Sequence, residues 1–275
     1  LLSPLVNFSD AIKRVATGDF SVRVKTDYSF PELGELAGHF NKMVQELGSI
    51  ESLRNDFAAN ISHEFRTPLA AIEGYTTLLQ DHSLTESERD EYVHIIIDSV
   101  RQLSSLSGNI LAMSRLEKQE IVTNKTRYCL DEQLRQAILL LEPLWDEKKL
   151  DLDIEMEPAW YYGNADMIMQ VWVNLLHNAI QYTPKNGTIR VYLKNEDSQI
   201  RVAIQDTGIG MDEFTIAHIF DKFFRRDKNS STGNGLGLPM VKRILELSYG
   251  SVSVESRPDE GSSFTVILPV EAPDV

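Results

Sequence analysis

The sequence predicts a multidomain chain in which an all-α part precedes an α/β sandwich. Up to about residue 120, apolar residues recur at the spacing of three and four that is typical of helices. After Glu120, short alternating segments typical of strands are interleaved with helical ones. The 275 residues, of which 42% are apolar and 25% charged, are enough for two or three globular units of ordinary composition.

The first helices are expected over residues 4–15 and from Pro31 onward, with a loop at Gly18 and Asp19 between them. In the second helix the apolar positions step by four and three, which is the spacing of a coiled-coil seam. Two successive steps of three between residues 50 and 57 shift this seam, and we expect the helix to continue through the shift.

Residues 51–80 and 87–118 are predicted to form a hairpin of two long helices. Thr85 and Glu88 make a capping box at the start of the second one. Both helices carry broad apolar stripes, which a lone hairpin covers poorly. We therefore expect two copies of the chain to associate as a homodimer through a four-helix bundle.

The α/β part is predicted from the alternation of strand and helix patterns. The strands expected at 188–193 and 200–206 are predicted to pair as a hairpin, and residues 225–237 are predicted to form a polar loop. The other expected elements are helices at 130–148, 165–181 and within 233–247, and strands at 150–156, 251–255 and 264–268.

Composition excludes several classes of function. The net charge is −14, from 27 basic and 41 acidic residues, and this argues against a nucleic-acid partner because binding phosphates requires a surplus of Lys and Arg. The single cysteine, Cys129, excludes an internal disulfide framework and a cysteine zinc cluster. No apolar run approaches the roughly 20 residues of a membrane-spanning helix.

The first candidate reactive group is the segment from His63 to Leu69. It places Pro68 inside a predicted helix, where proline costs roughly 3 kcal/mol. His63 and Thr67 are four residues apart and so share one helix face. A neutral imidazole is a fair nucleophile, and Glu64 beside it can accept its proton or fix its tautomer. By itself, a histidine here is more often part of a solvated helix face.

Two further motifs follow in the α/β part. Asn174 and Asn178 share a face of one helix and offer amide oxygens suited to Mg²⁺. Asp206, at the end of an apolar strand, can accept a hydrogen bond from an exocyclic amine, while Gly208 and Gly210 let the backbone approach a ligand closely. Each of these signals is weak alone, since polar surface residues or a plain turn would look the same.

A second glycine motif consists of Gly233, Gly235 and Gly237, just before a helix. Free N–H groups at a helix N-terminus favour phosphate. The preceding polar loop fits a dinucleotide-binding βαβ unit badly, and the sequence contains no phosphate-binding loop of the G-x-x-x-x-G-K-[ST] type.

In combination, these motifs resemble those of the sensor histidine kinases of two-component systems, over essentially the whole chain. Within that family, the segment at His63 is similar to that of kinases with OmpR-type partners, especially the WalK/VicK type. The motifs that carry the resemblance are, in order, His63-Glu64-x-x-Thr67-Pro68-Leu69, Asn174-x-x-x-Asn178, Asp206-x-Gly208-x-Gly210, Phe220-Asp-Lys-Phe-Phe-Arg225 and Gly233-x-Gly235-x-Gly237.

The resemblance implies three domains. Residues 1–50 would be a HAMP signal-relay module, residues 51–120 a dimerisation and histidine phosphotransfer domain, and residues 121–275 an ATP-binding domain of the Bergerat (GHKL) fold. Because a HAMP module normally follows a transmembrane helix, such a segment is expected before residue 1. The chain would then be the cytoplasmic portion of a bacterial plasma-membrane sensor.

The resemblance also implies the chemistry. His63 would accept the terminal phosphoryl group of ATP, with Glu64 as its acid/base partner. The phosphoryl group would then pass to an aspartate of an OmpR-type response regulator. Thr67 would position water when the kinase dephosphorylates that regulator, so the chain is expected to be a protein-histidine kinase with phosphatase activity.

The remaining residues are expected to bind Mg-ATP. Asp206 would bind the adenine amine in a pocket shaped by Gly208 and Gly210, and Arg225 would reach the terminal phosphate. Gln181 departs from the family, many of whose members place a Lys there, and this puts the tightness of nucleotide binding in doubt. Asn178 would bind Mg²⁺, with support from Asn174. Tyr182 and Lys222 would contact the nucleotide, although many members carry Arg at the position of Lys222. The lid would consist of Gly233, Gly235 and Gly237.

Two alternatives remain open from the sequence. One is a hydrolysing ATPase of the Bergerat superfamily, like Hsp90 or MutL. Such enzymes place a Glu four residues before the metal-binding Asn, where this chain has Asn174, and this favours transfer to His63. The other is a dimeric relay that binds nucleotide without turnover.

Overall fold

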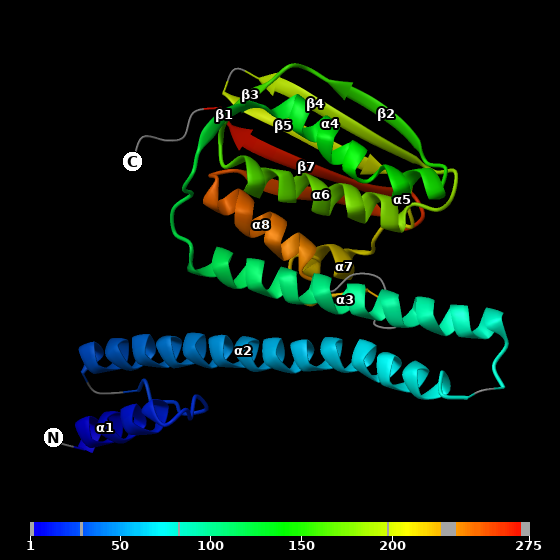
Figure 1. The fold of residues 1–275 in the computed structure, drawn as a ribbon. Helices are drawn as coiled ribbons and strands as arrows, with labels where there is room; N and C mark the ends of the chain where they lie inside the picture. Colours follow the sequence, from blue (N-terminus) through cyan, green and yellow to red (C-terminus); the bar gives the residue numbers. More distant parts are fainter. Residues whose placement is uncertain (1–2, 28–29, 82, 197, 227–234, 271–275) are drawn as a thin grey trace. The chain divides into compact units, whose positions relative to one another are not determined.

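The computed structural model describes residues 3–27, 30–81, 83–196, 198–226 and 235–270 and divides into two compact units at Thr67 and Pro68 (Figure 1). The helices are α1 (Ser3–Ala16), α2 (Pro31–Leu78), α3 (Glu86–Lys118), α4 (Leu130–Leu140), α5 (Glu142–Glu147), α6 (Ala165–Tyr182), α7 (Glu213–His218) and α8 (Gly237–Leu247). The strands are β1 (Thr126–Cys129), β2 (Asp151–Met156), β3 (Trp160–Gly163), β4 (Thr188–Glu196), β5 (Gln199–Asp206), β6 (Ser251–Arg257) and β7 (Gly261–Pro269).

The N-terminal unit contains a small core between α1, the segment that follows it and the start of α2. Phe8 and Phe40 meet edge to face, with 5.7 Å between ring centroids. The side-chain amide of Asn41 accepts a hydrogen bond from Val24 N–H and donates one to the Val24 carbonyl, both at 2.8 Å. These contacts attach the extended segment to α2. The buried members of this core are Phe8, Ala11, Val22, Val24, Ala37, Phe40 and Val44.

Helix α2 continues without interruption from Pro31 to Leu78, which confirms that the helix passes through the seam shift. It also passes through Pro68, although proline has no N–H for the usual bond to the carbonyl four residues earlier. The capping box predicted for α3 is present, because Glu88 N–H bonds to Thr85 Oγ1 and the Glu88 carboxylate accepts the Thr85 N–H. No helix in the described ranges is long and apolar enough to cross a membrane.

A five-stranded mixed sheet forms the centre of the α/β part. Its strand order is β2-β4-β5-β7-β6, with β2 and β4 parallel and the other neighbours antiparallel. Along β5 the side chains are alternately buried and half-buried, as expected for a sheet with its core on one face. The register pairs Asp206 with Ser262 of β7, so the end of β5 lies beside the start of β7.

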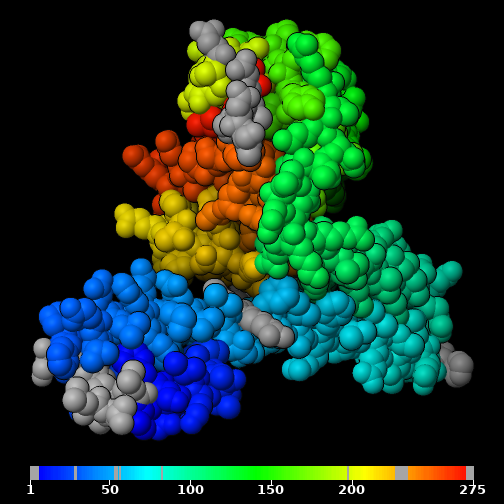
Figure 2. Space-filling view, turned by 90° about the vertical axis from the view of Figure 1, so that its left-hand side faces the viewer, coloured from blue at the N-terminus to red at the C-terminus, as the bar shows by residue number. Residues whose placement is uncertain are grey.

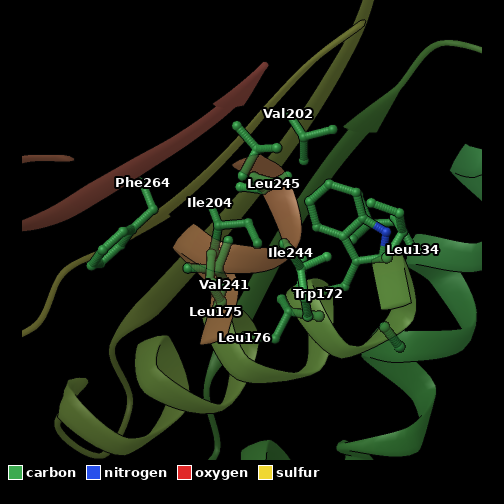
Figure 3. Close-up of a cluster of buried hydrophobic side chains, with 14 of the residues drawn as sticks. Leu134, Trp172, Leu175, Leu176, Val202, Ile204, Val241, Ile244, Leu245 and Phe264 are labelled. Carbon is green, nitrogen blue, oxygen red and sulfur yellow. The ribbon is translucent and has the colours of Figure 1, made fainter. Parts of the chain in front are cut away.

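Helices α4, α6 and α8 lie along one face of this sheet, which makes a two-layer α/β sandwich and confirms the predicted fold class (Figure 1). The core between the layers is apolar and continuous (Figure 3). Its largest side chain, Trp172 on α6, is fully buried and donates its indole N–H to Gln133 on α4 at 3.0 Å. This core holds α6 rigidly against the sheet.

Three local predictions needed correction. The helix expected over residues 130–148 is two helices, α4 and α5, because Pro143 starts a new helix after a turn at Leu141. The short strands β1 and β3, which pair with each other, and the short helix α7 were not predicted. Four-residue strands and a six-residue helix are too short to produce a clear periodic pattern.

Candidate active site

His63, Glu64 and Thr67 lie near the end of the N-terminal unit, on consecutive turns of α2. The His63 and Thr67 side chains are exposed, and Glu64 is half-buried. The Thr67 hydroxyl donates to the His63 carbonyl at 3.4 Å, which is long for a hydrogen bond. This part of α2 therefore presents an imidazole and a loosely held hydroxyl on one accessible face.

Asp206 lies at the end of β5, and its carboxylate is fixed by the backbone. One oxygen, Oδ1, accepts N–H bonds from Gly208 at 2.8 Å and from Ser262 at 3.2 Å. Only 9% of the residue is exposed, and this burial raises the pKa of the carboxyl while the two backbone bonds oppose the rise. With Oδ1 occupied, the second oxygen, Oδ2, remains to accept a hydrogen bond from a ligand.

The turn after Asp206 requires glycine. Gly210 has a φ of +60°, and a Cβ there would overlap the carbonyl oxygen of Arg257. The turn is tied to the end of α6 because Ile209 N–H donates to the Tyr182 carbonyl at 3.3 Å. Arg226 donates to the Gly210 carbonyl at 2.9 Å. Gly208 therefore packs between Asp206 and the end of α6, and Gly210 packs against the end of β6, so that the two form a closely packed glycine cradle.

Helix α6, whose end is tied to this turn, also carries the two predicted asparagines. Asn174 and Asn178 are both half-buried. Asn174 donates its amide N–H to the Gln170 carbonyl at 2.8 Å, and a Cβ at Gly237 would lie 2.8 Å from its Oδ1. The amide oxygen of Asn174 thus faces the first turn of α8, where Gly237 leaves room for it.

Tyr182 ends α6, and 46% of the residue is exposed. Partial burial raises the pKa of its hydroxyl, and the nearby positive charge of Arg225 opposes that rise. Tyr182 and Arg225 are therefore close in space, although 43 positions separate them in the sequence. Two of the predicted contacts, Tyr182 and Arg225, are thus brought together at the end of α6.

Residues 219–226, which follow α7, lie beside α8 (Figures 1 and 2). Phe223 N–H donates to the Gly235 carbonyl at 2.8 Å, and both residues have positive φ values, 61° and 65°. A Cβ at Gly235 would crowd the Phe223 backbone, so this close pairing requires glycine. Gly233, also predicted to contact nucleotide, lies outside the described residues, as do residues 227–234 of the expected loop.

Lys222 is placed differently from the other predicted nucleotide contacts. Its ammonium group forms an ion pair with Glu117 near the end of α3. Arg243 of α8 binds the same end of α3 through the Leu116 carbonyl at 3.2 Å and the Gln119 carbonyl at 2.9 Å. In this arrangement Lys222 contacts α3.

A cleft of about 630 Å³ also borders Asp206. Its lining includes Thr188, Arg190 and Gln205, which point to the sheet face opposite the core, and no described residue of α6. We therefore assign the candidate site to the α6 side of Asp206 and not to this cleft.

Sequence reasoning missed three residues that build the site. Ser262 fixes Asp206 through its N–H. Gly261 passes so close to the Asp206 carbonyl that a Cβ would overlap it. Lys148 donates to three carbonyls at the end of α6. The run of one glycine and two serines at positions 261–263 could have indicated a close approach of two backbone segments. Nothing in the sequence connects Lys148 with α6.

Three family models match the chain in sequence order. The HAMP domain matches residues 1–49, and the His Kinase A (phospho-acceptor) domain matches residues 53–119. The family described as histidine kinase-, DNA gyrase B- and HSP90-like ATPase matches residues 163–272.

Several known proteins are similar to this chain. The heme sensor protein HssS of Staphylococcus aureus (strain JH9) is 30% identical over 269 residues, which cover 98% of this chain and 58% of HssS. The chain thus spans less than two thirds of that relative. Full-length ShkA, solved in complex with AMPPNP, is 27% identical, with a TM-score of 0.58 over 81% of this chain and 46% of ShkA.

The histidine kinase ThkA, solved in complex with the response regulator protein TrrA, shares the fold. Its TM-score is 0.67 at 24% identity, over 81% of this chain and 64% of ThkA. With a HAMP domain, a phospho-acceptor domain and an ATPase-type domain in this order, the chain belongs to the sensor histidine kinases of two-component systems.

Proposed function

We propose that this chain is the cytoplasmic signalling part of a bacterial plasma-membrane sensor and that it phosphorylates its own His63 from Mg-ATP. The observation that carries the proposal is the fixed carboxylate of Asp206 beside a glycine cradle, in a chain that also exposes His63 on a long helix. We place the HAMP module at residues 1–50, the phosphotransfer domain at 51–120 and the ATP-binding domain at 121–275.

Asp206 binds the adenine in this proposal. Its Oδ2 accepts a hydrogen bond from the exocyclic amine, because Oδ1 is held by Gly208 and Ser262. Gly208 and Gly210 let the turn pack closely against the Tyr182 and Arg257 carbonyls, which holds its backbone beside the base. Tyr182 lines the pocket. Such an arrangement selects adenine over guanine, since guanine presents a carbonyl where adenine presents the amine, and two acceptors would face each other.

The phosphates extend along α6 towards α8. Asn178, supported by Asn174, holds Mg²⁺ through an amide oxygen, which fits an ion that keeps few protein ligands and shares its coordination with substrate phosphates. When bound, Mg²⁺ neutralises charge on the phosphates. Arg225 binds the terminal phosphate, while Lys222, Gly233, Gly235 and Gly237 complete the nucleotide contacts.

His63 is the nucleophile. A lone pair of its neutral imidazole attacks the γ-phosphorus, the bond to the β–γ bridging oxygen breaks, and ADP leaves. The phosphorylated ring then loses its remaining N–H proton, and Glu64 accepts it. Rate enhancement comes chiefly from positioning and from the charge that Arg225 spreads over the transferring group.

The phosphoryl group then passes to an aspartate of a response regulator, which we propose is of the OmpR type, as for kinases similar to WalK/VicK. In the reverse role, Thr67 orients a water against the regulator's phosphoaspartate. Its hydroxyl is suited to this because it is exposed and only weakly bonded to the His63 carbonyl.

The working form is a homodimer. Along α3, the exposed apolar residues Val93, Ile97 and Val100 step by four and three, which is the spacing of a helix–helix seam. A second copy of the hairpin covers such a seam and completes a four-helix bundle.

Incubation of the purified chain with γ-labelled Mg-ATP tests the proposed kinase. We expect label on the protein that is stable in base and lost in acid, and we expect His63→Gln to abolish it while leaving ATP binding near normal. Release of free phosphate alone would instead indicate a hydrolysing ATPase. Asn174 argues against that alternative, because its amide cannot act as the general base that a Glu supplies at this position. ATP binding without label or free phosphate would indicate a relay.

A further inference from the structure

The end of α6 is closed by a lysine from a distant part of the chain. Lys148, in the loop after α5, donates to the carbonyls of Ile180 and Gln181, both at 2.8 Å, and of Thr183 at 3.0 Å. Its side chain is half-buried, and this burial lowers the pKa of the ammonium group. An ammonium group has three N–H donors, and here each has a backbone acceptor.

These carbonyls need an outside donor because of the local sequence. The last four carbonyls of a helix have no partner within the helix. Thr183 supplies its own N–H and hydroxyl to Ala179, and Ile209 N–H bonds to Tyr182. The carbonyl of Ile180 would normally pair with the residue four positions later, but that residue is Pro184, which has no N–H. Lys148 supplies the missing donor.

The same turn of α6 carries the residues that we assign to the nucleotide. Asn178 and Tyr182 project from it, and its backbone is bonded to the turn after Asp206 through Ile209. A helix C-terminus carries a partial negative charge of roughly half an electron, which repels phosphates. Gln181 brings no charge to offset it. The ammonium of Lys148 does, directly at the carbonyls where that partial charge resides.

We propose that Lys148 is a positioning residue for the nucleotide site, where it fixes the last turn of α6 and cancels the negative end of that helix. It acts through the turn and does not touch the phosphates, because its three donors are already engaged. This inference rests on the proposed assignment of Asn178 and Tyr182 to Mg-ATP.

The test compares Lys148→Met and Lys148→Arg with a matched control, Lys149→Met, in the full 275-residue chain. The Lys149 side chain is the next in sequence and is exposed. For Lys148→Met we expect the calorimetric Kd and the KM for Mg-ATP to rise about tenfold, equivalent to about 1.4 kcal/mol. The kcat at saturating ATP should change by less than about twofold, because the reacting groups are intact. Lys148→Arg should recover most of the affinity.

Two results would overturn the proposal. One is a Kd for Lys148→Met equal to that of Lys149→Met. The other is a fall in kcat that matches the loss of folded protein, with KM unchanged, which would indicate a purely structural role. Should Lys148→Met fail to fold, Lys148→Gln gives the same comparison. Because calorimetry measures binding without turnover, the result for Lys148 stands even if no phosphoprotein forms, so failure of the proposed kinase remains distinguishable.

Discussion

Lys222, one of the predicted nucleotide contacts, forms an ion pair with Glu117 and is thereby bound to the end of α3. Both side chains are more than 40% exposed, and a pair of this kind contributes at most about 1 kcal/mol. The pair therefore competes weakly with any anion that Lys222 can reach.

Removal of that competition tests the nucleotide role of Lys222. In Glu117→Gln the ammonium group loses its carboxylate partner, so we expect the Kd for Mg-ATP to fall by about twofold to fivefold, in line with the worth of an exposed pair. Lys222→Met should raise it. Calorimetry on both variants gives the answer, and equal Kd values for both variants and the unaltered chain would contradict a nucleotide contact at Lys222.

The fixed Asp206 carboxylate predicts a loss of binding in Asp206→Asn. The Asn oxygen can still accept the N–H bonds of Gly208 and Ser262, which directs the NH₂ group towards the adenine amine. Two donors would then face each other, and we expect the Kd for Mg-ATP to rise at least about 100-fold, as when a buried polar partner is left unpaired. Circular dichroism should show unchanged helix content in this variant. Retained binding in Asp206→Asn would refute the adenine assignment.

Asn178→Asp should also abolish Mg-nucleotide binding, again with unchanged helix content.

The raised pKa of Asp206 predicts a pH dependence. The pKa of the Asp206 carboxyl is higher in the folded state than in the unfolded chain. At pH values between these two pKa values folding takes up a proton, so protonation of Asp206 favours the folded state. Ligand binding follows the opposite trend, since a protonated carboxyl is a poorer acceptor. We expect adenosine, which has no phosphate to titrate, to bind more weakly as the pH falls from about 7 to 4. NMR titration would reveal this, and an affinity constant over that range would contradict it.

Thr67→Ala should separate the two activities. Formation of phospho-His63 does not need the hydroxyl, and Ala is a good helix former, so labelling should stay within about threefold. Dephosphorylation of purified phospho-regulator in the presence of ADP should fall at least about tenfold, because the water loses its hydrogen-bonding partner.

Ser62→Ala is the matched control for Thr67→Ala, because the Ser62 hydroxyl is also exposed and bonds to a carbonyl four residues earlier. It should leave both activities unchanged. Equal decay of the regulator with the Thr67 variant and the unaltered chain would remove Thr67 from the mechanism. Parallel loss of both activities would indicate a structural role beside Pro68.

The proposed homodimer predicts that its seam is sensitive to buried charge. The double variant Ile97→Glu, Val100→Glu would bury two carboxylates from each protomer at the proposed interface. We expect this variant to sediment as a monomer at tens of micromolar protein, where the unaltered chain should be a dimer. Glu91→Gln, on an exposed polar position of α3, serves as the control. A monomeric unaltered chain under these conditions would contradict the four-helix bundle.

Much of this architecture could be predicted because local patterns determine it. The Thr85–Glu88 capping box, the long helices and the strand pair β4–β5 each depend on residues close in sequence. Pro143 could have indicated the break between α4 and α5, but the apolar pattern on both sides of it favoured one continuous helix. The support of the site was not predictable, because Lys148 reaches carbonyls 32 to 35 positions away and Ser262 lies 56 positions from Asp206. Such contacts arise from the packing of the whole fold and produce no periodic pattern in the sequence.

The bond pair between Asn41 and Val24 makes one amide proton of the N-terminal unit informative. Val24 lies in a stretch without helix or strand, where amide hydrogens normally exchange with solvent within the shortest times. Its N–H is instead held by Asn41 Oδ1. Deuterium uptake at the Val24 amide therefore reports how often this stretch detaches from α2. A single backbone position can thus be used to follow local opening of the N-terminal unit.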